Sequence, residues 1–147
     1  MDRSKVAIII PAFNEELTIE KVIKEIKQYG NVFVVDDCSK DNTSKLSQKS
    51  GAFVIRNKKN LGYEKSIDIG FQFAVKKKNI NVLITYDGDD QFNPKDIPFF
   101  LKHIDNGADI VVGKREKMQR LSEFIFSFYT KIKYHINDPL CGLKAYK

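Results

Sequence analysis

Short runs of β-branched and other apolar residues recur along the chain, and longer helical patterns separate them. Several runs are apolar at every position, which is typical of strands buried on both faces of a parallel sheet. Five runs are predicted to be strands: residues 6–10, 32–35, 53–55, 81–86 and 109–112. The alternation predicts a single α/β domain over residues 1–147, with a mostly parallel, Rossmann-like sheet covered by helices on both faces.

The segments between the predicted strands carry signals for helix starts and stops. In residues 16–30, apolar side chains recur at helical spacing until the pattern stops at a glycine. Asp41 or Asn42 is suited to cap a helix after the second strand. Asn93 followed by Pro94 is a typical start for a further helix. The predicted order of elements is therefore βαβαβαβαβ.

The composition is that of a folded, soluble protein, with 42% hydrophobic and 30% charged residues. No apolar run approaches the ~20 residues that span a bilayer. The first apolar run is interrupted by Pro11 and lacks a small-residue cleavage site, so we expect no signal peptide. Cys38 and Cys141 form no metal-ligand spacing and are expected to be reduced thiols of a cytoplasmic protein.

The net charge of +6 is unevenly distributed. From residue 114 onward, eight Lys and Arg face three acidic residues, a local charge of +5, which leaves +1 for the rest of the chain. A basic segment of this kind is compatible with anionic lipid, with nucleic acid or with solubility alone.

Three polar loops follow predicted strands: residues 11–16 (PAFNEE), 36–43 (DDCSKDNT) and 87–91 (DGDDQ). In open α/β sheets, ligands bind beyond the carboxyl ends of the strands, where such loops converge. The loops are therefore predicted to form one site.

The DGDDQ loop places Asp87 and Asp89 on either side of Gly88. Like charges this close raise each other's pKa unless a partner relieves the repulsion. Carboxylate and amide oxygens suit Mg²⁺ or Mn²⁺, which also take oxygens from a substrate phosphate. The simpler alternative is a turn exposed to solvent.

In the DDCSKDNT loop, Asp36 and Asp37 end a buried strand. One of the two can cap backbone amides while the other accepts hydrogen bonds from a base or a ribose. The alternative is a strand-to-helix connection that uses these residues for turns and caps only.

Several function classes lack their motifs in this sequence. There is no GxxxxGK[ST], no GxGxxG and no GxSxG, and His103 and His135 have no Cys or His at zinc-ligand spacing. A phosphoacceptor receiver domain shares the VVDD run and a lysine after the last strand, here Lys114. The DGDDQ loop does not fit the phosphorylated position of a receiver, so this class is disfavoured.

Six motifs, in order, resemble a known family: PAFNEE, VVDDCSKDNT, NLG, DGDDQFNP, VVGKR and DPLCGLKAYK. Together they resemble the family-2 glycosyltransferases with the GT-A fold, and most of all the polyprenyl-phosphate sugar transferases of the dolichyl-phosphate mannose synthase type. The resemblance runs from residue 6 to residue 147.

The resemblance implies roles for individual positions. It places nucleotide-sugar contacts at Pro11, Phe13, Glu15, Val35, Asp37, Asp87, Gly88, Val112 and Arg115. It places metal ligands at Asp89 and Gln91, and catalytic roles at Asp89 and Arg115. Within this set Asp37 meets the base, Asp87 faces the ribose, and Arg115 lies near the phosphates of donor and acceptor.

The implied activity is transfer of a sugar from a nucleoside-diphosphate sugar to an acceptor, expected to be a polyprenyl phosphate, with Mg²⁺ or Mn²⁺. Relatives usually continue past the segment that resembles CGLKAYK, so the chain is short on the acceptor side. The alternative is therefore a nucleotide-sugar-binding module without transfer activity. Glu64 also departs from the family, since many relatives have a small residue there. No nucleic-acid partner is expected.

The segment 121–136 has apolar residues at helical spacing: Leu121, Phe124, Ile125, Phe128 and Ile132. Aromatic residues beside Lys131 and Lys133 suit a helix lying on anionic lipid at the cytoplasmic face of a membrane. The alternative is a helix that packs on its own domain or on a second copy of the chain.

Overall fold

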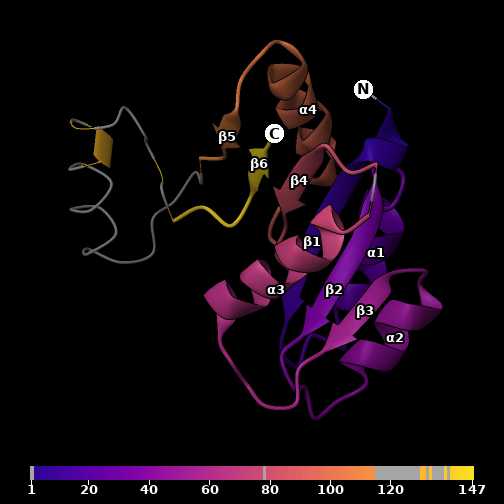
Figure 1. Ribbon diagram of the computed structural model, residues 1–147. Helices are drawn as coiled ribbons and strands as arrows, with labels where there is room; N and C mark the ends of the chain where they lie inside the picture. Colours follow the sequence, from indigo (N-terminus) through magenta and orange to yellow (C-terminus); the bar gives the residue numbers. More distant parts are fainter. Residues whose placement is uncertain (1, 78, 115–129, 132, 134–137, 139) are drawn as a thin grey trace.

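The computed structural model describes residues 2–77, 79–114, 130, 131, 133, 138 and 140–147. Within these residues one sheet has the strand order β3-β2-β1-β4-β6-β5 (Figure 1). Its strands are β1 (Val6–Ala12), β2 (Asn31–Asp36), β3 (Phe53–Arg56), β4 (Val82–Thr85), β5 (Ile110–Val112) and β6 (Lys144–Tyr146). The helices are α1 (Ile19–Ile26), α2 (Thr43–Lys49), α3 (Tyr63–Val75) and α4 (Ile97–Asp105), with 3-10 turns η1 (Arg3–Lys5) and η2 (Pro94–Asp96). All five predicted strands are confirmed.

The central strand β1 is buried on both faces, as its uninterrupted apolar sequence predicts. Ile8 and Ile10 belong to the core that includes α1 and α4, whereas Ile9 faces the second core, formed with β2 and α3. Figure 1 shows α3 in front of the sheet. Complete burial of a side chain of this size is worth about 1.5–3 kcal/mol, so a polar substitution in β1 would disrupt the centre of the fold.

Helix α3 lies close to β1 because Gly70 has no side chain. A Cβ atom at this position would stand 2.3 Å from Cγ2 of Ile9 and 3.2 Å from Cγ2 of Val35. The glycine therefore sets the distance between α3 and the sheet, and with it the position of the polar loop at the start of α3.

Two predicted helix starts are confirmed. Asp41 accepts a hydrogen bond from the amide of Thr43 (2.9 Å), the first residue of α2. Asn93 accepts one from the amide of Lys95 (3.1 Å) and begins η2, which leads into α4. Both loops therefore satisfy backbone donors that the first turn of a helix leaves free.

Strand β6 was not among the predicted strands. It lies antiparallel between β4 and β5, where Lys144 pairs with Thr85 and with Val112. The ring of Tyr146 packs edge-on against Phe71 of α3, with ring centroids 5.4 Å apart. The insertion brings the residues before β6 next to the end of β4.

No helix in the part of the chain that the structure describes is long and apolar enough to cross a membrane. Of the predicted helix 121–136, only Thr130, Lys131 and Lys133 are described, and both lysines are exposed. The remaining residues of that helix lie outside the described residues.

Candidate functional site

The DGDDQ loop begins directly after β4 and is anchored at Gly88. The carbonyl of Gly88 accepts a hydrogen bond from the hydroxyl of Thr18 (2.7 Å), just before α1. A Cβ atom at this glycine would stand 3.3 Å from Cγ2 of Ile10 and 3.4 Å from Cδ1 of Ile19. This close packing against β1 and α1 fixes the backbone between Asp87 and Asp89.

The carboxylate of Asp87 lies close to residues distant in sequence. The Tyr63 hydroxyl, at the start of α3, donates a hydrogen bond to Oδ1 of Asp87 (2.9 Å). A Cβ atom at Gly142 would stand 2.0 Å from Oδ2, so a larger residue there would force the carboxylate or the Gly142 segment to shift. Burial raises the pKa of Tyr63, and the negative charge of Asp87 raises it further. The tyrosine therefore remains a neutral donor.

Three of the predicted site residues form one acidic cluster: Glu15, Asp87 and Asp89. Burial raises the pKa of Glu15, and the negative charges of Asp89, Asp41 and Asp87 raise it further. Glu15 follows β1 and the two aspartates follow β4, so the fold concentrates negative charge where the two strands end. A bound cation would relieve this repulsion.

The two predicted metal ligands, Asp89 and Gln91, share one tight turn. Oδ1 of Asp89 accepts a hydrogen bond from the backbone amide of Gln91 (3.2 Å). Among the described residues, no group of three or more His, Cys, Asp or Glu side chains could hold a metal ion. A few oxygen ligands nevertheless fit Mg²⁺ or Mn²⁺, because such ions complete their coordination with substrate phosphates and water.

The third carboxylate of the loop, Asp90, has a different partner. It forms an ion pair of 2.5 Å with Lys21 of α1, and its backbone lies in the left-handed region at φ 64°. The DGDDQ loop therefore has two aspartates in the acidic cluster and one bound to a lysine of the neighbouring helix.

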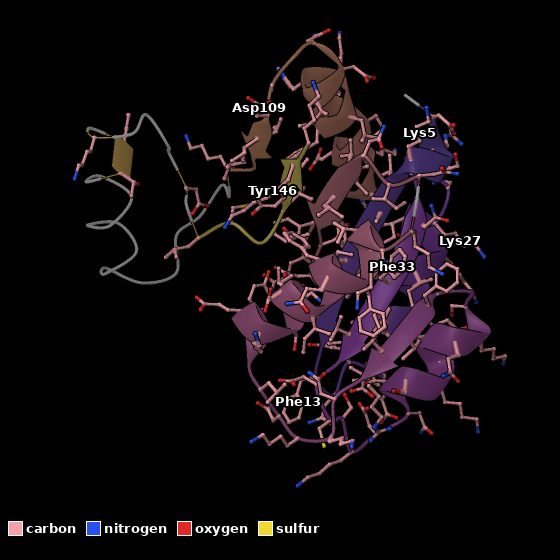
Figure 2. All side chains as sticks on the ribbon, in the orientation of Figure 1. Lys5, Phe13, Lys27, Phe33, Asp109 and Tyr146 are labelled. Carbon is pink, nitrogen blue, oxygen red and sulfur yellow. The ribbon has the colours of Figure 1, made fainter. Side chains whose placement is uncertain are left out.

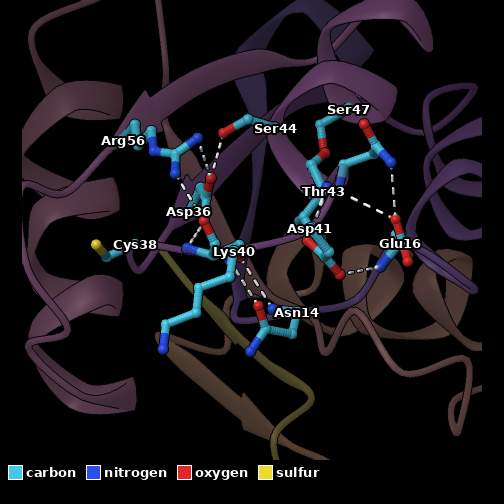
Figure 3. A network of polar contacts seen from close by, with 12 residues as sticks. Asn14, Glu16, Asp36, Cys38, Lys40, Asp41, Thr43, Ser44, Ser47 and Arg56 are labelled. Atoms are coloured by element: carbon cyan, nitrogen blue, oxygen red, sulfur yellow. Dashed lines mark hydrogen bonds and ion pairs between the residues drawn. The ribbon is translucent and has the colours of Figure 1, made fainter.

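At the end of β2, Asp36 holds the following loop in place. Its carboxylate is fully buried and accepts hydrogen bonds from the Ser39 amide (2.8 Å) and from the Ser44 hydroxyl. Arg56 of β3 lies 3.7 Å away (Figure 3). These contacts occupy both oxygens of Asp36 and leave ligand binding to other residues.

Asp37 is 4% exposed and joins the 36–43 loop to the segment before α3. Its carboxylate accepts hydrogen bonds from the side chain of Asn57 and from the amides of Leu61 and Gly62, each at 2.8 Å. Burial raises its pKa, but these hydrogen bonds outweigh burial and hold the pKa below the ordinary value. Its contact with a nucleobase stays a prediction, and a base would share this carboxylate with the loop.

The first two polar loops are joined directly by hydrogen bonds (Figure 3). Oδ1 of Asn14 accepts from the amide of Lys40 (2.8 Å), and the amide of Glu16 donates to Asp41 (3.1 Å). Oε2 of Glu16 in turn accepts from the side chain of Asn42 (3.0 Å). The loops after β1 and β2 therefore behave as one structural unit.

The other predicted nucleotide contacts differ in accessibility. Phe13 is 45% exposed and lies at the opposite end of the molecule from Lys5 (Figure 2). Pro11 is half-buried and pairs in register with Val35, whose side chain is fully buried; contacts of both residues with a nucleotide stay predictions. Val112 ends β5 and is half-buried, and Arg115 lies outside the described residues.

A cavity of about 450 Å³ opens beside the acidic cluster. Its lining includes Tyr63, Ile67, Asp87, Gln91, Gly142 and Lys144. The hydroxyl of Thr85 donates to the carbonyl of Gly142 (2.6 Å) and fixes this wall to β4. Tyr63 and Lys144 are absent from the predicted site residues. The DPLCGLKAYK motif was the signal for Lys144, and the NLG motif, which directly precedes Tyr63, was the signal for that residue.

The sequence matches the family model of glycosyl transferase family 2 over residues 7–139. The chain belongs to this family. The match includes all three polar loops and the acidic cluster, so the residues assembled at this edge of the sheet are those of a family-2 glycosyltransferase.

Curated relatives of this family-2 chain include sugar transferases with lipid acceptors in their names. An uncharacterized protein of Methanocaldococcus jannaschii is 39% identical over 160 residues, 95% of this chain and 70% of that protein. The dolichol-phosphate mannosyltransferase of Pyrococcus furiosus is 34% identical over 120 residues, 76% of this chain and 33% of that protein. The UDP-N-acetylglucosamine–dolichyl-phosphate N-acetylglucosaminyltransferase of Methanococcus voltae is 28% identical, over 95% of this chain and 68% of that protein.

A solved structure of glucosyl-3-phosphoglycerate synthase from Mycobacterium tuberculosis is similar to this chain with a TM-score of 0.79 and 22% identity. That structure contains Mn²⁺, UDP-glucose and phosphoglyceric acid. The likeness covers 99% of this chain and 57% of the solved chain. It confirms the predicted GT-A fold, and this chain spans little more than half the length of that neighbour.

Proposed function

We propose that this chain transfers a sugar from a nucleoside-diphosphate sugar to a polyprenyl phosphate. The observation that carries the proposal is the acidic cluster of Glu15, Asp87 and Asp89, of which Asp87 lines a cavity of about 450 Å³. Relatives named as dolichyl-phosphate and undecaprenyl-phosphate sugar transferases support this acceptor class. The UDP-glucose and Mn²⁺ of the solved neighbour support the donor class.

The donor is bound by the loops that the structure joins together. The base lies against the 13–16 and 36–43 loops, with Phe13 exposed beside it, and the ribose reaches Asp87. The diphosphate lies beside Asp89 and Gln91, which would hold Mg²⁺ or Mn²⁺. When bound, the cation supplies positive charge that stabilises the diphosphate as a leaving group.

The acceptor needs no general base in this proposal, because a lipid phosphate oxygen is already an anion. The task of the protein is to orient that oxygen toward the anomeric carbon and to exclude water. Lys144 lines the cavity, and Arg115 suits the same phosphate through its bidentate guanidinium. An acceptor of this class places the chain at the cytoplasmic face of a membrane.

The second candidate function is a binding module that holds the nucleotide sugar without transferring it. The part matched by this chain is 33% of the mannosyltransferase and 57% of the solved synthase, and the polar loops assigned to the donor lie within it. The module would bind donor and metal normally and form no product with any acceptor.

The decisive experiment compares two aspartates of the same loop. Thermal unfolding is measured with UDP-glucose or GDP-mannose, each with and without Mn²⁺. A ligand at a hundredfold excess over Kd adds about 2.7 kcal/mol to the free energy of unfolding. We expect Asp89→Ala to lose the Mn²⁺-dependent part of this stabilisation, and Asp90→Ala, bound to Lys21, to keep it. Equal responses of the two variants would refute the metal assignment.

Product formation then separates the two candidate functions. The chain is incubated with labelled donor, Mn²⁺ and a prenyl phosphate, and the lipid fraction is analysed for label. Labelled lipid supports the transferase. Donor binding without labelled lipid for any prenyl phosphate tested supports the binding module.

A further inference from the structure

A second groove adjoins the candidate site on the side of α4. It has a volume of about 280 Å³ and is lined by Phe92, Phe99, Phe100, Lys114, Cys141 and Leu143, among others. Phe92 and Cys141 also line the larger cavity beside the acidic cluster. The two spaces therefore lie side by side and share a wall.

The walls of the groove are fixed by contacts inside the fold. The Tyr86 hydroxyl donates to the Phe92 carbonyl (2.7 Å), and the two rings meet edge-on at 5.7 Å. The Gly113 amide donates to the Leu143 carbonyl (2.9 Å). A Cβ atom at Gly113 would stand 2.9 Å from Sγ of Cys141, so the end of β5 packs tightly here. The groove is a preformed feature of the fold.

One wall of the groove is an aromatic side chain left open to solvent. Phe99 is 65% exposed, although Phe100 beside it is buried in the core. An exposed aromatic residue is ordinary by itself, but here it lines an apolar groove that continues from a polar site. The combination suits an elongated apolar ligand whose head group reacts in the neighbouring cavity.

The charges at the groove favour an anionic head group. Lys114 is exposed and lines the groove, and Arg115 follows it in the sequence. Asp96 is the one acidic residue among the described lining residues, and it belongs to the turn that precedes α4. A phosphate is therefore expected at the Lys114 end, with its chain extending along Phe99.

We propose that this groove binds the first isoprene units of the acceptor, with the acceptor phosphate between Lys114 and the acidic cluster. The inference rests on the proposed function, because it takes a polyprenyl phosphate as the acceptor. It adds a binding site for the lipid chain to the site for the nucleotide sugar. Affinity for the acceptor then depends on the length of the prenyl chain and on Phe99.

The test measures binding of isopentenyl, geranyl and farnesyl phosphates, which differ only in the length of the prenyl chain. Each is titrated below its aggregation limit by calorimetry in the presence of UDP and Mn²⁺. Burial of the added isoprene units predicts that farnesyl phosphate binds at least about tenfold tighter than isopentenyl phosphate. Dodecyl phosphate is the comparison for an unbranched chain and is expected to bind more weakly than farnesyl phosphate.

Phe99→Ala should remove most of the dependence on chain length and leave isopentenyl phosphate binding unchanged. Phe99 is exposed, so Phe99→Ala should keep the fold, and Phe73→Ala provides the matched control on α3. Phe73 is 47% exposed and lines neither space. Asp96→Asn should tighten binding of all three phosphates.

Three results would overturn the groove proposal: equal binding of the three prenyl phosphates, full farnesyl phosphate affinity in Phe99→Ala, or dodecyl phosphate binding as tightly as farnesyl phosphate. The response to UDP-glucose and Mn²⁺ is measured on the same samples and reports the donor site separately. A protein that binds donor and transfers sugar to isopentenyl phosphate without dependence on chain length would lose the groove proposal and keep the proposed function.

Discussion

Asp36 and Asp37 stand side by side at the end of β2, yet the fold gives them different partners. Asp36 faces Ser39, Ser44 and Arg56, whereas Asp37 holds the loop before α3. The sequence indicates that such a pair ends a strand and that one member can hold backbone amides. It cannot assign the partners of Asp37, because these lie 20 to 25 residues later in the chain.

Asp37→Asn is predicted to destabilise the protein. The substitution replaces a buried carboxylate, and one of its acceptor atoms becomes an amide group facing backbone N–H donors. The expected loss is about 1–3 kcal/mol in the free energy of unfolding, measured by denaturant titration at neutral pH. Asp109→Asn, at an exposed position, should change little. A stable Asp37→Asn with weaker nucleotide binding would instead assign this carboxylate to the base alone.

The same residue predicts a pH dependence. Because hydrogen bonds hold the Asp37 pKa below the ordinary value of 3.8, the ionised carboxylate stabilises the fold above that pH. This contribution is lost as the pH falls from about 3.8 through the folded-state pKa. Thermal unfolding across this range should show a smaller acid-induced loss in Asp37→Asn than in the wild type, and parallel curves would contradict the prediction.

Tyr63→Phe tests the hydrogen bond that holds Asp87. The variant keeps the ring and removes the donor, so Asp87 loses the hydrogen bond from Tyr63. A hydrogen bond to a charged group contributes about 1.5–3 kcal/mol, and partial exposure of Tyr63 favours the lower value. We expect the affinity for UDP-glucose with Mn²⁺ to fall about tenfold by calorimetry. Tyr29→Phe, at a tyrosine just before β2, is the control. Equal affinities of the two variants for UDP-glucose with Mn²⁺ would show that Tyr63 is not part of the site.

At the scale of elements, the predicted strands differ from β6, the strand that the sequence analysis does not predict. The runs at 6–10, 32–35 and 81–86 are buried by the sheet and helices, so their own composition marks them. Strand β6 has the sequence Lys-Ala-Tyr and becomes a strand through its pairing with β4 and β5. Tertiary context decides such short segments, and local propensity does not.

Gly142→Ala tests whether the segment before β6 shapes the site. The added methyl group would collide with the Asp87 carboxylate, so either the carboxylate or the segment must shift. The matched control is Gly30→Ala, at the residue directly before β2. A Cβ atom there would stand 2.8 Å from the carbonyl oxygen of Val6 in β1. We expect both variants to lose stability in thermal unfolding and only Gly142→Ala to lose donor affinity. A Gly142→Ala variant with normal affinity for UDP-glucose and Mn²⁺ would show that Asp87 is not essential to donor binding.

At the scale of the whole molecule, the positive charge and the aromatic segment 121–136 belong to the same part of the sequence. If this segment rests on lipid, each of its cations contributes about 1 kcal/mol near an anionic surface, and salt weakens the attraction. We predict co-sedimentation with anionic liposomes that falls with added salt and with Phe128→Glu. Phe73→Glu serves as the control.

Two other results would contradict the membrane prediction. A protein that ignores liposomes but forms a dimer disrupted by Phe128→Glu would show that this segment contacts a second copy of the chain. Salt-sensitive binding to duplex DNA without binding to liposomes would point to nucleic acid, which shows the same dependence on salt.

The place of β6 in the sheet has a consequence for the order in which the molecule assembles. Among the described strands, β5 pairs with β6 alone, and β6 is synthesised later. During synthesis, β1, β2, β3 and β4 can therefore pair before β5 has a partner, and such distant pairing forms slowly. In hydrogen exchange, opening of β6 should expose the amides of β5 at the same time, while the parallel strands β1 and β2 remain protected.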